Sequence, residues 1–495
     1  MLRRIFGIFL DIKPTFPHIL SSAFTSDLFR PFSPTIPVKP LCTTIAKHLL
    51  LLAGVIFLSP LFSTPEAQAI PAFARKYDVN CTVCHARVPR LNRTGERFLE
   101  NGYQLPGTED GDTIKKSRLG DLTLDDVTNY LGFRMRGNIL QTTDYARHAS
   151  GTNIDGNPED RTELGFPEVF SLLTAGTITN NVGFFAEVES NLEEGETGVE
   201  RAFVTFNNIG QHDWAHLRIG KFDPSAYSSY ATLRQQFELV GDDSVDNGSF
   251  MLPTINRIGL TPAAFASKFS GLFDRSGTAI VPTAPSLFHA VAEMGLDIHG
   301  RPFGDWFLYQ VGILNGANEP FGDSNNPKDW YVMTRFDLAQ SNYFSANFSG
   351  FAYFGSNNAK VSTMADVNWS RYGFAANVRY DLVDVYAAFV VDQVTDLPAS
   401  LKNSFDSTAT GLTVEANVLA TDRILFGIRF DHLHAGGLRT QRTNTTLLAL
   451  IAKYYLRSNI AVFLRDDINL RQAQGGHAPE RNFRNAFFVG ADVAF

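Results

Sequence analysis

Five consecutive residues near the amino end have the types and spacing of a cofactor attachment sequence. They are Cys81-Thr82-Val83-Cys84-His85. Two thiols separated by two residues can add to the two vinyl groups of haem, and the adjoining histidine supplies an axial ligand to the iron. The sequence therefore predicts one covalently attached haem c, with Cys81 and Cys84 as its thioether residues and His85 as the proximal iron ligand.

The two cysteines have two other conceivable uses. One is a disulfide between Cys81 and Cys84, and the other is a structural zinc site. Zinc would need two more ligands, yet neither Cys nor His occurs within the sixty residues that follow His85. The third cysteine, Cys42, precedes a predicted export signal, so we expect no role for it in the mature protein.

The sixth coordination position of the haem iron has no nearby candidate, because neither His nor Met occurs between His85 and Met135. Water, an open position or a distant histidine can fill it. Each distant candidate has the alternative of being an ordinary solvated histidine. The candidates are His289 and His299 on a predicted luminal strand face, and His432 and His434 near a strand end.

The segment before the motif has the features of an export signal. Residues 49–62 form an apolar run, Lys47 precedes it, and Ala67-Gln68-Ala69 follows it as an A-x-A cleavage site. We expect cleavage after Ala69, so that residues 1–69 are a signal peptide; an anchor helix is the alternative. The first forty residues are too long for a normal n-region, and we interpret them as lying upstream of the true translation start.

Residues 70–126 are predicted to form a small α-helical cytochrome segment around the motif. A helix is expected over residues 88–103, with Pro89 in its first turn and Gly102 past its end. Its apolar face packs either on the porphyrin or on other parts of the protein. That face consists of Leu91, Gly95, Phe98 and Leu99. A segment this small buries little surface by itself and needs a neighbour.

Residues 127–495 show the alternation of half-buried strands. In residues 424–431, Ile424, Phe426, Ile428 and Phe430 alternate with polar or small residues. Similar stretches are residues 130–142, 181–191, 288–299, 306–315, 342–355, 374–380, 412–418, 459–470 and 487–495. The last of these ends in Phe495, as the closing strand of an outer-membrane barrel does. The fold predicted for this region is therefore a transmembrane antiparallel β-barrel.

The barrel is expected to have sixteen strands, with eighteen as the alternative, because even numbers are usual for such barrels. Residues 223–287 are rich in Gly, Ser and Pro, which predicts either a loop folded into the lumen or a long outer loop. The chain has a net charge of −8, and removal of residues 1–69 makes it −11. This acidic balance argues against a nucleic-acid partner.

The order of these parts resembles the fused monohaem cytochrome-porins of the outer membrane of iron-oxidising bacteria. The resemblance covers the mature chain as architecture, and its specific residues are Cys81, Cys84, His85 and Phe495. It implies electron transfer across the outer membrane, with extracellular ferrous iron as donor and a periplasmic carrier such as a soluble cytochrome as acceptor. The protein would then act as an iron oxidase. The alternative is a diffusion porin whose cytochrome segment is a plug, a sensor or a tether.

Overall fold

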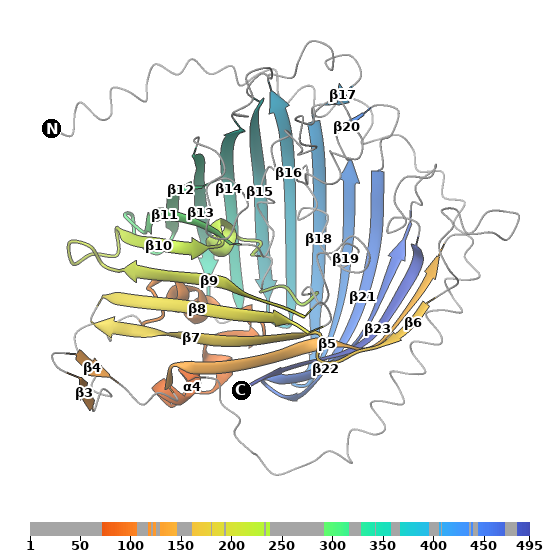
Figure 1. The fold of residues 1–495 in the computed structure, drawn as a ribbon, viewed down its shortest axis with the longest axis horizontal. Helices are drawn as coiled ribbons and strands as arrows, with labels where there is room; N and C mark the ends of the chain where they lie inside the picture. Colours follow the sequence, from red (N-terminus) through yellow and green to blue (C-terminus); the bar gives the residue numbers. More distant parts are fainter. Residues whose placement is uncertain are drawn as a thin grey trace, which may run out of the picture. The chain divides into compact units, whose positions relative to one another are not determined.

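The computed structural model (Figure 1) describes most of the chain after residue 71, and all described residues belong to one compact unit, Thr64–Phe495. The described ranges are 72–105, 117–119, 122–124, 129–145, 161–179, 181–192, 195–231, 234–237, 292–315, 328–341, 343–357, 367–395, 405–406, 408–434, 437–438, 444–470 and 483–495. The predicted signal peptide lies outside these ranges.

A closed antiparallel barrel dominates the structure. Its strands in the first part are β5 (Leu131–Tyr145), β6 (Arg161–Leu164), β7 (Val169–Thr179), β8 (Val182–Asn191), β9 (Glu196–Phe206), β10 (His216–Phe222), β11 (Glu293–Gly300) and β12 (Phe307–Leu314). The later strands are β13 (Asp329–Gln340), β14 (Phe344–Asn357), β15 (Val367–Tyr380), β16 (Val383–Thr395), β18 (Thr408–Thr421), β19 (Ile424–His434), β21 (Asn444–Arg457), β22 (Ile460–Asn469) and β23 (Phe483–Ala494).

The barrel has sixteen strand positions, as predicted. β6 and β7 pair with successive stretches of β5, so together they form one interrupted strand. The last strand closes the sheet against β5: the backbone N–H of Phe133 donates to the Phe495 carbonyl at 2.7 Å, and the reverse bond is 2.9 Å. The two phenyl rings stack with centroids 5.5 Å apart. The terminal aromatic residue therefore lies at the seam of the barrel.

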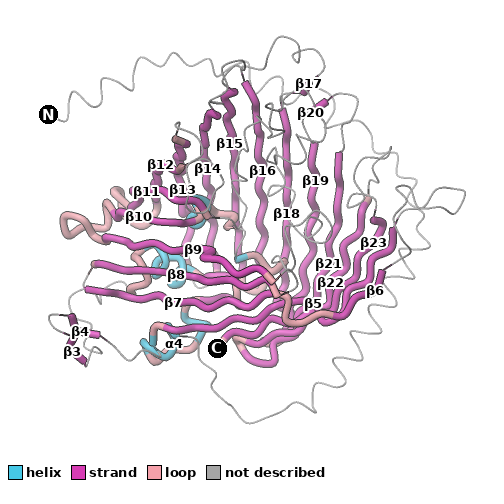
Figure 2. Tube along the Cα trace, in the orientation of Figure 1, coloured by secondary structure: helices cyan, strands magenta, loops and turns pink. Residues whose placement is uncertain are grey.

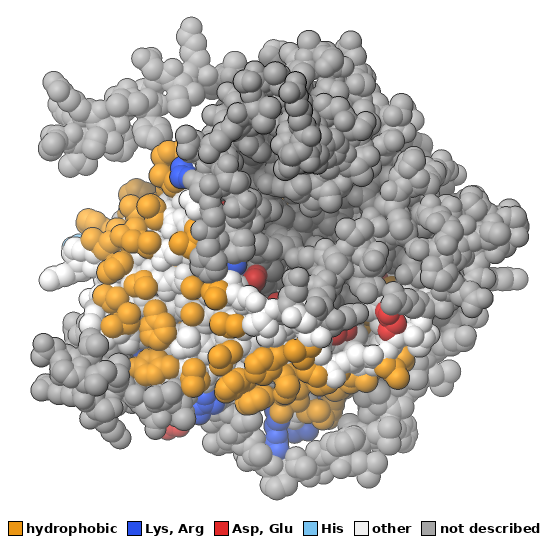
Figure 3. Space-filling view, viewed as in Figure 1, with side chains coloured by type: hydrophobic (Ala, Val, Ile, Leu, Met, Phe, Trp, Pro, Cys, Tyr) orange, Lys and Arg blue, Asp and Glu red, His pale blue; other side chains and the backbone are white. Residues whose placement is uncertain are grey.

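The strands alternate between an apolar outer face and a polar lumen. In β19, Phe426 and Ile428 are 38% and 46% exposed on the outside, whereas Arg429 and Asp431 are buried inside. Hydrophobic side chains form a broad area on the outer wall in Figure 3. A closed sheet with this outer face satisfies its backbone hydrogen bonds in lipid. The predicted faces of residues 424–431 are thereby confirmed.

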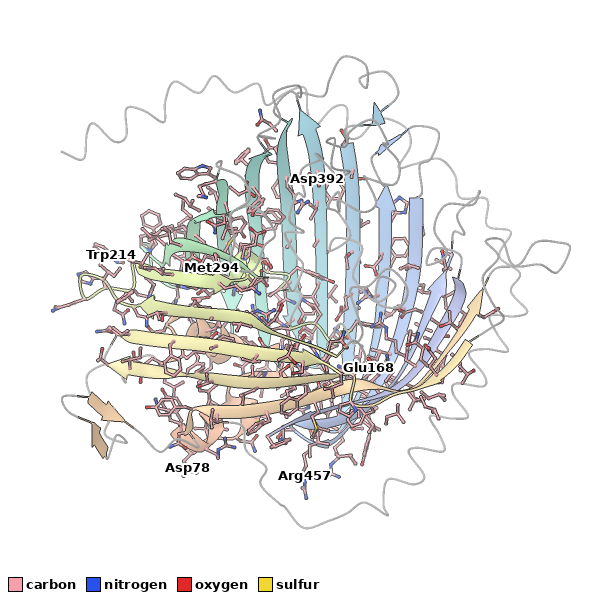
Figure 4. All side chains as sticks on the ribbon, in the orientation of Figure 1. Asp78, Glu168, Trp214, Met294, Asp392 and Arg457 are labelled. Carbon is pink, nitrogen blue, oxygen red and sulfur yellow. The ribbon has the colours of Figure 1, made fainter. Side chains whose placement is uncertain are left out.

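The two ends of the barrel differ in their connections. At one end, two-residue turns join β15 to β16, β18 to β19 and β21 to β22. At the other end, longer stretches separate β12 from β13, β14 from β15 and β22 from β23. Figure 4 shows Arg457, which ends β21 at a two-residue turn, at the lower edge of the barrel, and Asp392 near the upper end of β16. Because outer-membrane barrels have short periplasmic turns, the short-turn end is the periplasmic mouth.

Two pieces of chain occupy the lumen (Figure 2). The first is the N-terminal segment, residues 72–105, which lies in the periplasmic mouth. The second, here called the inward segment, comprises residues 223–231 and 234–237 between β10 and β11; it includes the 3-10 helix η4 (Pro224–Tyr227). Ser229 N–H donates to Ser349 Oγ at 3.0 Å and Gln236 N–H to Glu415 Oε1 at 3.3 Å, both on the luminal wall. The predicted inward fold of the 223–287 stretch is therefore confirmed for these residues, and its remainder lies outside the described ranges.

The N-terminal segment contains α4 (Ala72–Tyr77), the 3-10 turn η2 (Cys81–Val83), β1 (His85–Arg87), β2 (Arg90–Leu91) and α5 (Arg93–Glu100). The remaining short strands of the described chain are β3 (Ser117–Leu119), β4 (Leu122–Leu124), β17 (Phe405–Asp406) and β20 (Gly437–Leu438). None of the described helices is long and apolar enough to cross a membrane.

The predicted helix over residues 88–103 was wrong at its start. β1 and β2 pair as a small hairpin, with His85 opposite Leu91, so the chain is extended until Asn92 caps the helix. The end was predicted correctly, because Gly102 takes the left-handed conformation at φ 63° that ends the helix.

Candidate functional site

The Cys81–Cys84 turn is tightly ordered by its own backbone. The side chain of Asn80 caps it by accepting a hydrogen bond from Thr82 N–H at 3.1 Å, and Cys84 N–H donates to the Cys81 carbonyl at 3.2 Å. Residues three apart on a 3-10 turn point in the same direction. Cys81 and Cys84 are both free thiols of intermediate exposure. The turn therefore offers two thiols on one side of the chain.

Both thiols are protonated at neutral pH. Burial raises the pKa of Cys81, although a hydrogen bond with Ser458 partly opposes the rise. Burial also raises the pKa of Cys84, and the neighbouring Cys81 adds to that rise. Two free thiols at this spacing are what covalent addition to the two vinyl groups of haem requires.

His85 presents a neutral imidazole. Burial lowers its pKa to about 4, against the opposing effect of hydrogen bonds with the backbone of Pro89 and Arg90. Its Nδ1 atom is buried and has no hydrogen-bond partner among the described residues. A neutral histidine with an unused nitrogen is the form that binds a metal. These features fit the predicted role of His85 as an axial ligand.

Asn92 holds the cysteine turn against helix α5. Its Nδ2 donates to the carbonyls of Thr82 at 3.1 Å and Val83 at 2.9 Å, and its backbone N–H donates to the Cys84 carbonyl at 2.9 Å. Its Oδ1 caps α5 by accepting from Gly95 N–H at 3.1 Å. One residue therefore both starts the helix and fixes the attachment turn.

Gly95 allows the helix to approach the turn closely. A Cβ atom at this position would lie 2.1 Å from the Cys84 carbonyl oxygen and 2.9 Å from Leu91 Cδ2. Since the first obstacle is backbone, no side-chain rotation removes it. The contact between α5 and the attachment turn therefore requires glycine.

The predicted apolar face of the helix packs on protein at Phe98. The Phe98 ring contacts Phe73, Tyr77 and Tyr103, with centroids 4.8, 5.9 and 5.9 Å away. Tyr103 in turn stacks on Phe185 of the barrel wall at 5.2 Å. This aromatic cluster joins α4, the end of α5 and the wall, and it leaves Phe98 no free face.

Charged residues of α5 bind the wall of the mouth. Glu100 receives two hydrogen bonds from Arg301, at 2.8 and 3.0 Å, and Arg335 binds Glu96. Burial alone would raise the pKa of Glu100, but the guanidinium groups of Arg301 and Arg335 hold it well below its usual range. Arg97 pairs with Asp213 in the β9–β10 connection. Opposite charges thus fasten both sides of the helix.

Arg90 forms a second anchor on the other side of the mouth. Its guanidinium bonds Asp384 at 3.2 Å, Glu96 at 3.0 Å and Asn377 at 2.7 Å. It also lies over the Tyr386 ring, 4.8 Å from the centroid. A buried arginine is stable only when its donors are satisfied. This position therefore ties the attachment region to β15 and β16.

Of the predicted distal candidates, His299 lies in the lumen, but both of its ring nitrogens are engaged. Its Nδ1 is 2.9 Å from Asp297 Oδ1 and its Nε2 is 3.1 Å from the Glu100 carbonyl. The ring thus helps to hold the end of α5 and, as it stands, offers no nitrogen to iron. His432 bonds Thr446 at 2.9 Å through Nδ1. His289 and the side chain of His434 lie outside the described residues.

Several residues of the site were not foreseen from the sequence. Asn92 could have been found, since Asn before a charged helical turn is a standard capping signal. The anchors Arg90, Glu96 and Glu100 had no such signal, because their partners come from distant strands.

The closed sheet, its apolar outer face and its unequal ends decide the architecture. The chain forms a closed antiparallel β-barrel of the outer-membrane type. No family model matches it, and no curated protein matches it. Solved structures with similar folds include the outer membrane channel DcaP of Acinetobacter baumannii (10% identity, TM-score 0.45, 74% of this chain and 96% of that chain). Another is Salmonella typhi OmpF in complex with daunomycin (11% identity, TM-score 0.47, 74% of this chain and 97% of that chain). A third is an anion-selective porin from Comamonas acidovorans (12% identity, TM-score 0.44, 74% of this chain and 98% of that chain).

Proposed function

We propose that this porin-like barrel transfers electrons across the outer membrane through one haem c. Cys81 and Cys84 would hold the haem covalently, and His85 would be its proximal iron ligand. The observation that carries the proposal is the attachment turn itself. It lies in the periplasmic mouth with two free thiols and a neutral imidazole, and Asn92 and Gly95 fix it there.

The physical need for such a protein follows from the membrane. The apolar band of an outer-membrane barrel is about 25 Å tall, and redox partners that stay outside the cell cannot cross it. When bound, haem c would supply reversible one-electron transfer. The protein's own residues would fix its position: the attachment turn is fastened to α5, and α5 is fastened by ion pairs to the wall.

The position of the turn suggests which partner it meets. Thr82 and Val83 are exposed at the mouth, and the Val83 side chain is 40% exposed. A periplasmic electron carrier such as a soluble cytochrome can approach this surface. The donor proposed for the outer side is extracellular ferrous iron, which would make the protein an iron oxidase.

A diffusion porin is the second candidate, because the barrel is porin-like. In that case the N-terminal segment would be a plug, a sensor or a tether. Two features oppose a wide open channel: Tyr227, Tyr230 and Phe237 of the inward segment are buried within the lumen, and α5 is paired to several parts of the wall. Conductance in planar bilayers separates the two functions. Haem-loaded protein should conduct poorly if it is an electron conduit, and a large steady conductance would favour the porin.

The first experiment is a spectrum of haem-loaded protein in detergent without oxygen, before and after addition of ferrous iron at acidic and neutral pH. We expect the bands of reduced haem c to appear with iron and to be absent from the Cys84→Ala variant. If only a strong chemical reductant produces the bands, ferrous iron is not the donor. If the wild-type protein carries no covalent haem at all, the proposal is wrong.

A further inference from the structure

A small cavity of about 30 Å³ lies between helix α5 and the barrel wall, at the periplasmic mouth. Six arginines and two carboxylates line it, together with the start of α5 and polar residues of β14. A space of this size holds roughly two or three water molecules or one small inorganic ion. It is too small for a haem or for a substrate with many atoms.

Most of the arginines around the cavity already have carboxylate partners. The largely buried ion pairs join Arg90, Arg97, Arg301 and Arg335 to Glu96, Glu100, Asp337 and Asp384, which is four cations with four anions. Arg93 pairs with Asp305, and their side chains are 50% and 59% exposed, so water screens that pair. Asp213, a further partner of Arg97, is 37% exposed and also binds His216. These charges therefore offset one another.

Arg379 is the arginine of this lining that has no ion pair. It faces the lumen at the periplasmic end of β15, and it is half-buried. Asp384 lies opposite it on β16, but that carboxylate binds Arg90 and Asn377. Asp381 is exposed in the turn that follows β15. Within the part of the chain that the structure describes, the Arg379 side chain has no hydrogen bond or ion pair, so its guanidinium lacks a counter-charge.

Two polar side chains of β14 line the same cavity without partners of their own. Ser345 is the cross-strand neighbour of Arg379, and Asn347 is the next luminal residue of that strand. Asn347 is only 7% exposed, and its Oδ1 atom is buried without a hydrogen-bond partner among the described residues. Rotation of the amide by half a turn places the Nδ2 donor at the same point. A guanidinium, a hydroxyl and an amide thus meet at one space with their donors unused.

The start of α5 adds further donors. Asn92, which caps the helix, and Arg93, its first residue, both line the cavity. The first N–H groups of a helix have no carbonyl partner within it and carry partial positive charge. Asn92 Oδ1 accepts the N–H of Gly95, which leaves the N–H groups of Arg93 and Thr94. A helix start of this kind stabilises a neighbouring anion.

We propose that this cavity binds one small inorganic anion through Arg379, Ser345, Asn347 and the start of α5. The anion supplies the counter-charge that Arg379 lacks, and its bonds join β14 and β15 to the N-terminal segment. Charge-assisted hydrogen bonds from a guanidinium are the strongest that the site offers. The site is separate from the attachment turn, and it does not depend on the proposed function.

The test is calorimetric titration of the full-length protein in detergent with sodium phosphate, sulfate and chloride. Sodium gluconate, whose anion is too large for the cavity, keeps the ionic strength constant. We expect one of the three anions to bind at one per chain, and Arg379→Gln to weaken that binding at least about tenfold, because a charged hydrogen bond is lost. Arg423→Gln is the matched control and should bind as the wild type does, because Arg423 is exposed at the β18–β19 turn and does not line the cavity.

Asn347→Asp is a second variant, which replaces the amide by a carboxylate of the same shape. It should abolish binding, because the new negative charge repels an anion. If Arg379→Gln does not fold, this variant decides: an affinity equal to that of the wild type would contradict the site.

Equal affinities in Arg379→Gln and Arg423→Gln would overturn the inference. So would a wild-type protein that binds none of the three anions, since the cavity would then hold water only. Binding of citrate as tightly as phosphate would also overturn it, because citrate does not fit a cavity of this size. Each of these results leaves the proposed function untouched, since none of them measures the haem.

Discussion

The two pieces of chain inside the barrel are held in opposite ways. The N-terminal segment brings its own charges to the wall: Arg90, Glu96 and Glu100 pair with arginines and carboxylates of the strands. The inward segment instead offers backbone carbonyls, and wall arginines donate to them. Arg335 reaches the Tyr227 carbonyl at 3.4 Å, and Arg429 reaches that of Phe237 at 3.1 Å.

The two modes of attachment therefore depend on different kinds of residue. A carbonyl is present whatever the side chain, so these two arginine bonds do not depend on which residues stand at positions 227 and 237. The bonds of the N-terminal segment do depend on its residues, because each anchor is a specific carboxylate or guanidinium. A covalently held cofactor needs a fixed position. Anchoring through specific side chains restricts the N-terminal segment to fewer positions than anchoring through carbonyls would. The predictions below test whether the two modes of attachment are separable.

The largest effect is expected from Glu100→Gln. The change removes the carboxylate that binds Arg301 and leaves this buried guanidinium with Asp337 as its remaining ionic partner. Breaking such a pair costs about 3–5 kcal/mol. The N-terminal segment should leave the mouth, and bilayer conductance should rise while the barrel stays folded. Asp305→Asn is the control, because Asp305 is 59% exposed and its pairs with Arg93 and Arg97 should contribute little.

Acidification gives an independent check of the same anchor. The pKa of Glu100 is held below its unfolded value, so its contribution to stability is present above that value, roughly pH 4.3, and is lost only as pH falls through the lower folded value. Conductance of the wild type should therefore stay constant from pH 7 to pH 5. A rise within that range would mean that a group other than Glu100 controls the opening of the mouth.

Arg429→Gln should affect the inward segment alone. The variant loses the bond to the Phe237 carbonyl and leaves Asp431 without the guanidinium that binds it at 2.9 Å. We expect a cost of a few kcal/mol by the same reasoning and a higher conductance with an unchanged haem spectrum. Arg423→Gln, at an exposed turn, controls for the charge. A changed haem spectrum would mean that the two luminal segments are coupled.

Gly95→Ala should disturb the attachment turn without touching either anchor. The added methyl would overlap the Cys84 carbonyl, and overpacking of this kind costs about 1–3 kcal/mol. A lower yield of covalent haem is expected at unchanged conductance. Gly198→Ala is the matched control, because nothing lies within 4 Å of a Cβ atom there. Equal yields in the two variants would contradict the close approach of α5.

The smallest effect is expected from Asn92→Ala, which removes the helix cap at a cost of about 1 kcal/mol. Asn92→Asp separates the two roles of this residue. It keeps the oxygen that caps Gly95 N–H but loses the Nδ2 donor to Thr82 and Val83. If Asn92→Asp has the thermal stability of the wild type but a lower haem yield, the two Nδ2 hydrogen bonds to the turn act separately from the helix cap.

The barrel was predictable because strand alternation is a local property. The faces of residues 424–431 could be read from neighbours two positions apart, and the structure places Arg429 inside and Phe426 outside accordingly. The helix start was missed because a local hairpin pairs His85 with Leu91 and keeps the chain extended, although the helical pattern begins at Pro89.

The charged residues that anchor the N-terminal segment could not be predicted, because their partners lie far away in the sequence. Glu100 becomes an anchor only because the register of β11 and its turn places Arg301 beside it, and no spacing within residues 93–100 contains that fact. The attachment motif was found because its five residues are contiguous. The fit of His85 for a ligand was likewise clear only after its burial was known.

The position of the N-terminal segment also implies an order of folding steps. Its partners Asp213, Arg301, Arg335 and Asp384 lie on neighbouring hairpins from β9 to β16, so they come together only when those strands have paired. The segment precedes all of them in the chain. It therefore reaches its final position only after those strands have paired, and until then its two cysteines are more accessible than in the finished barrel.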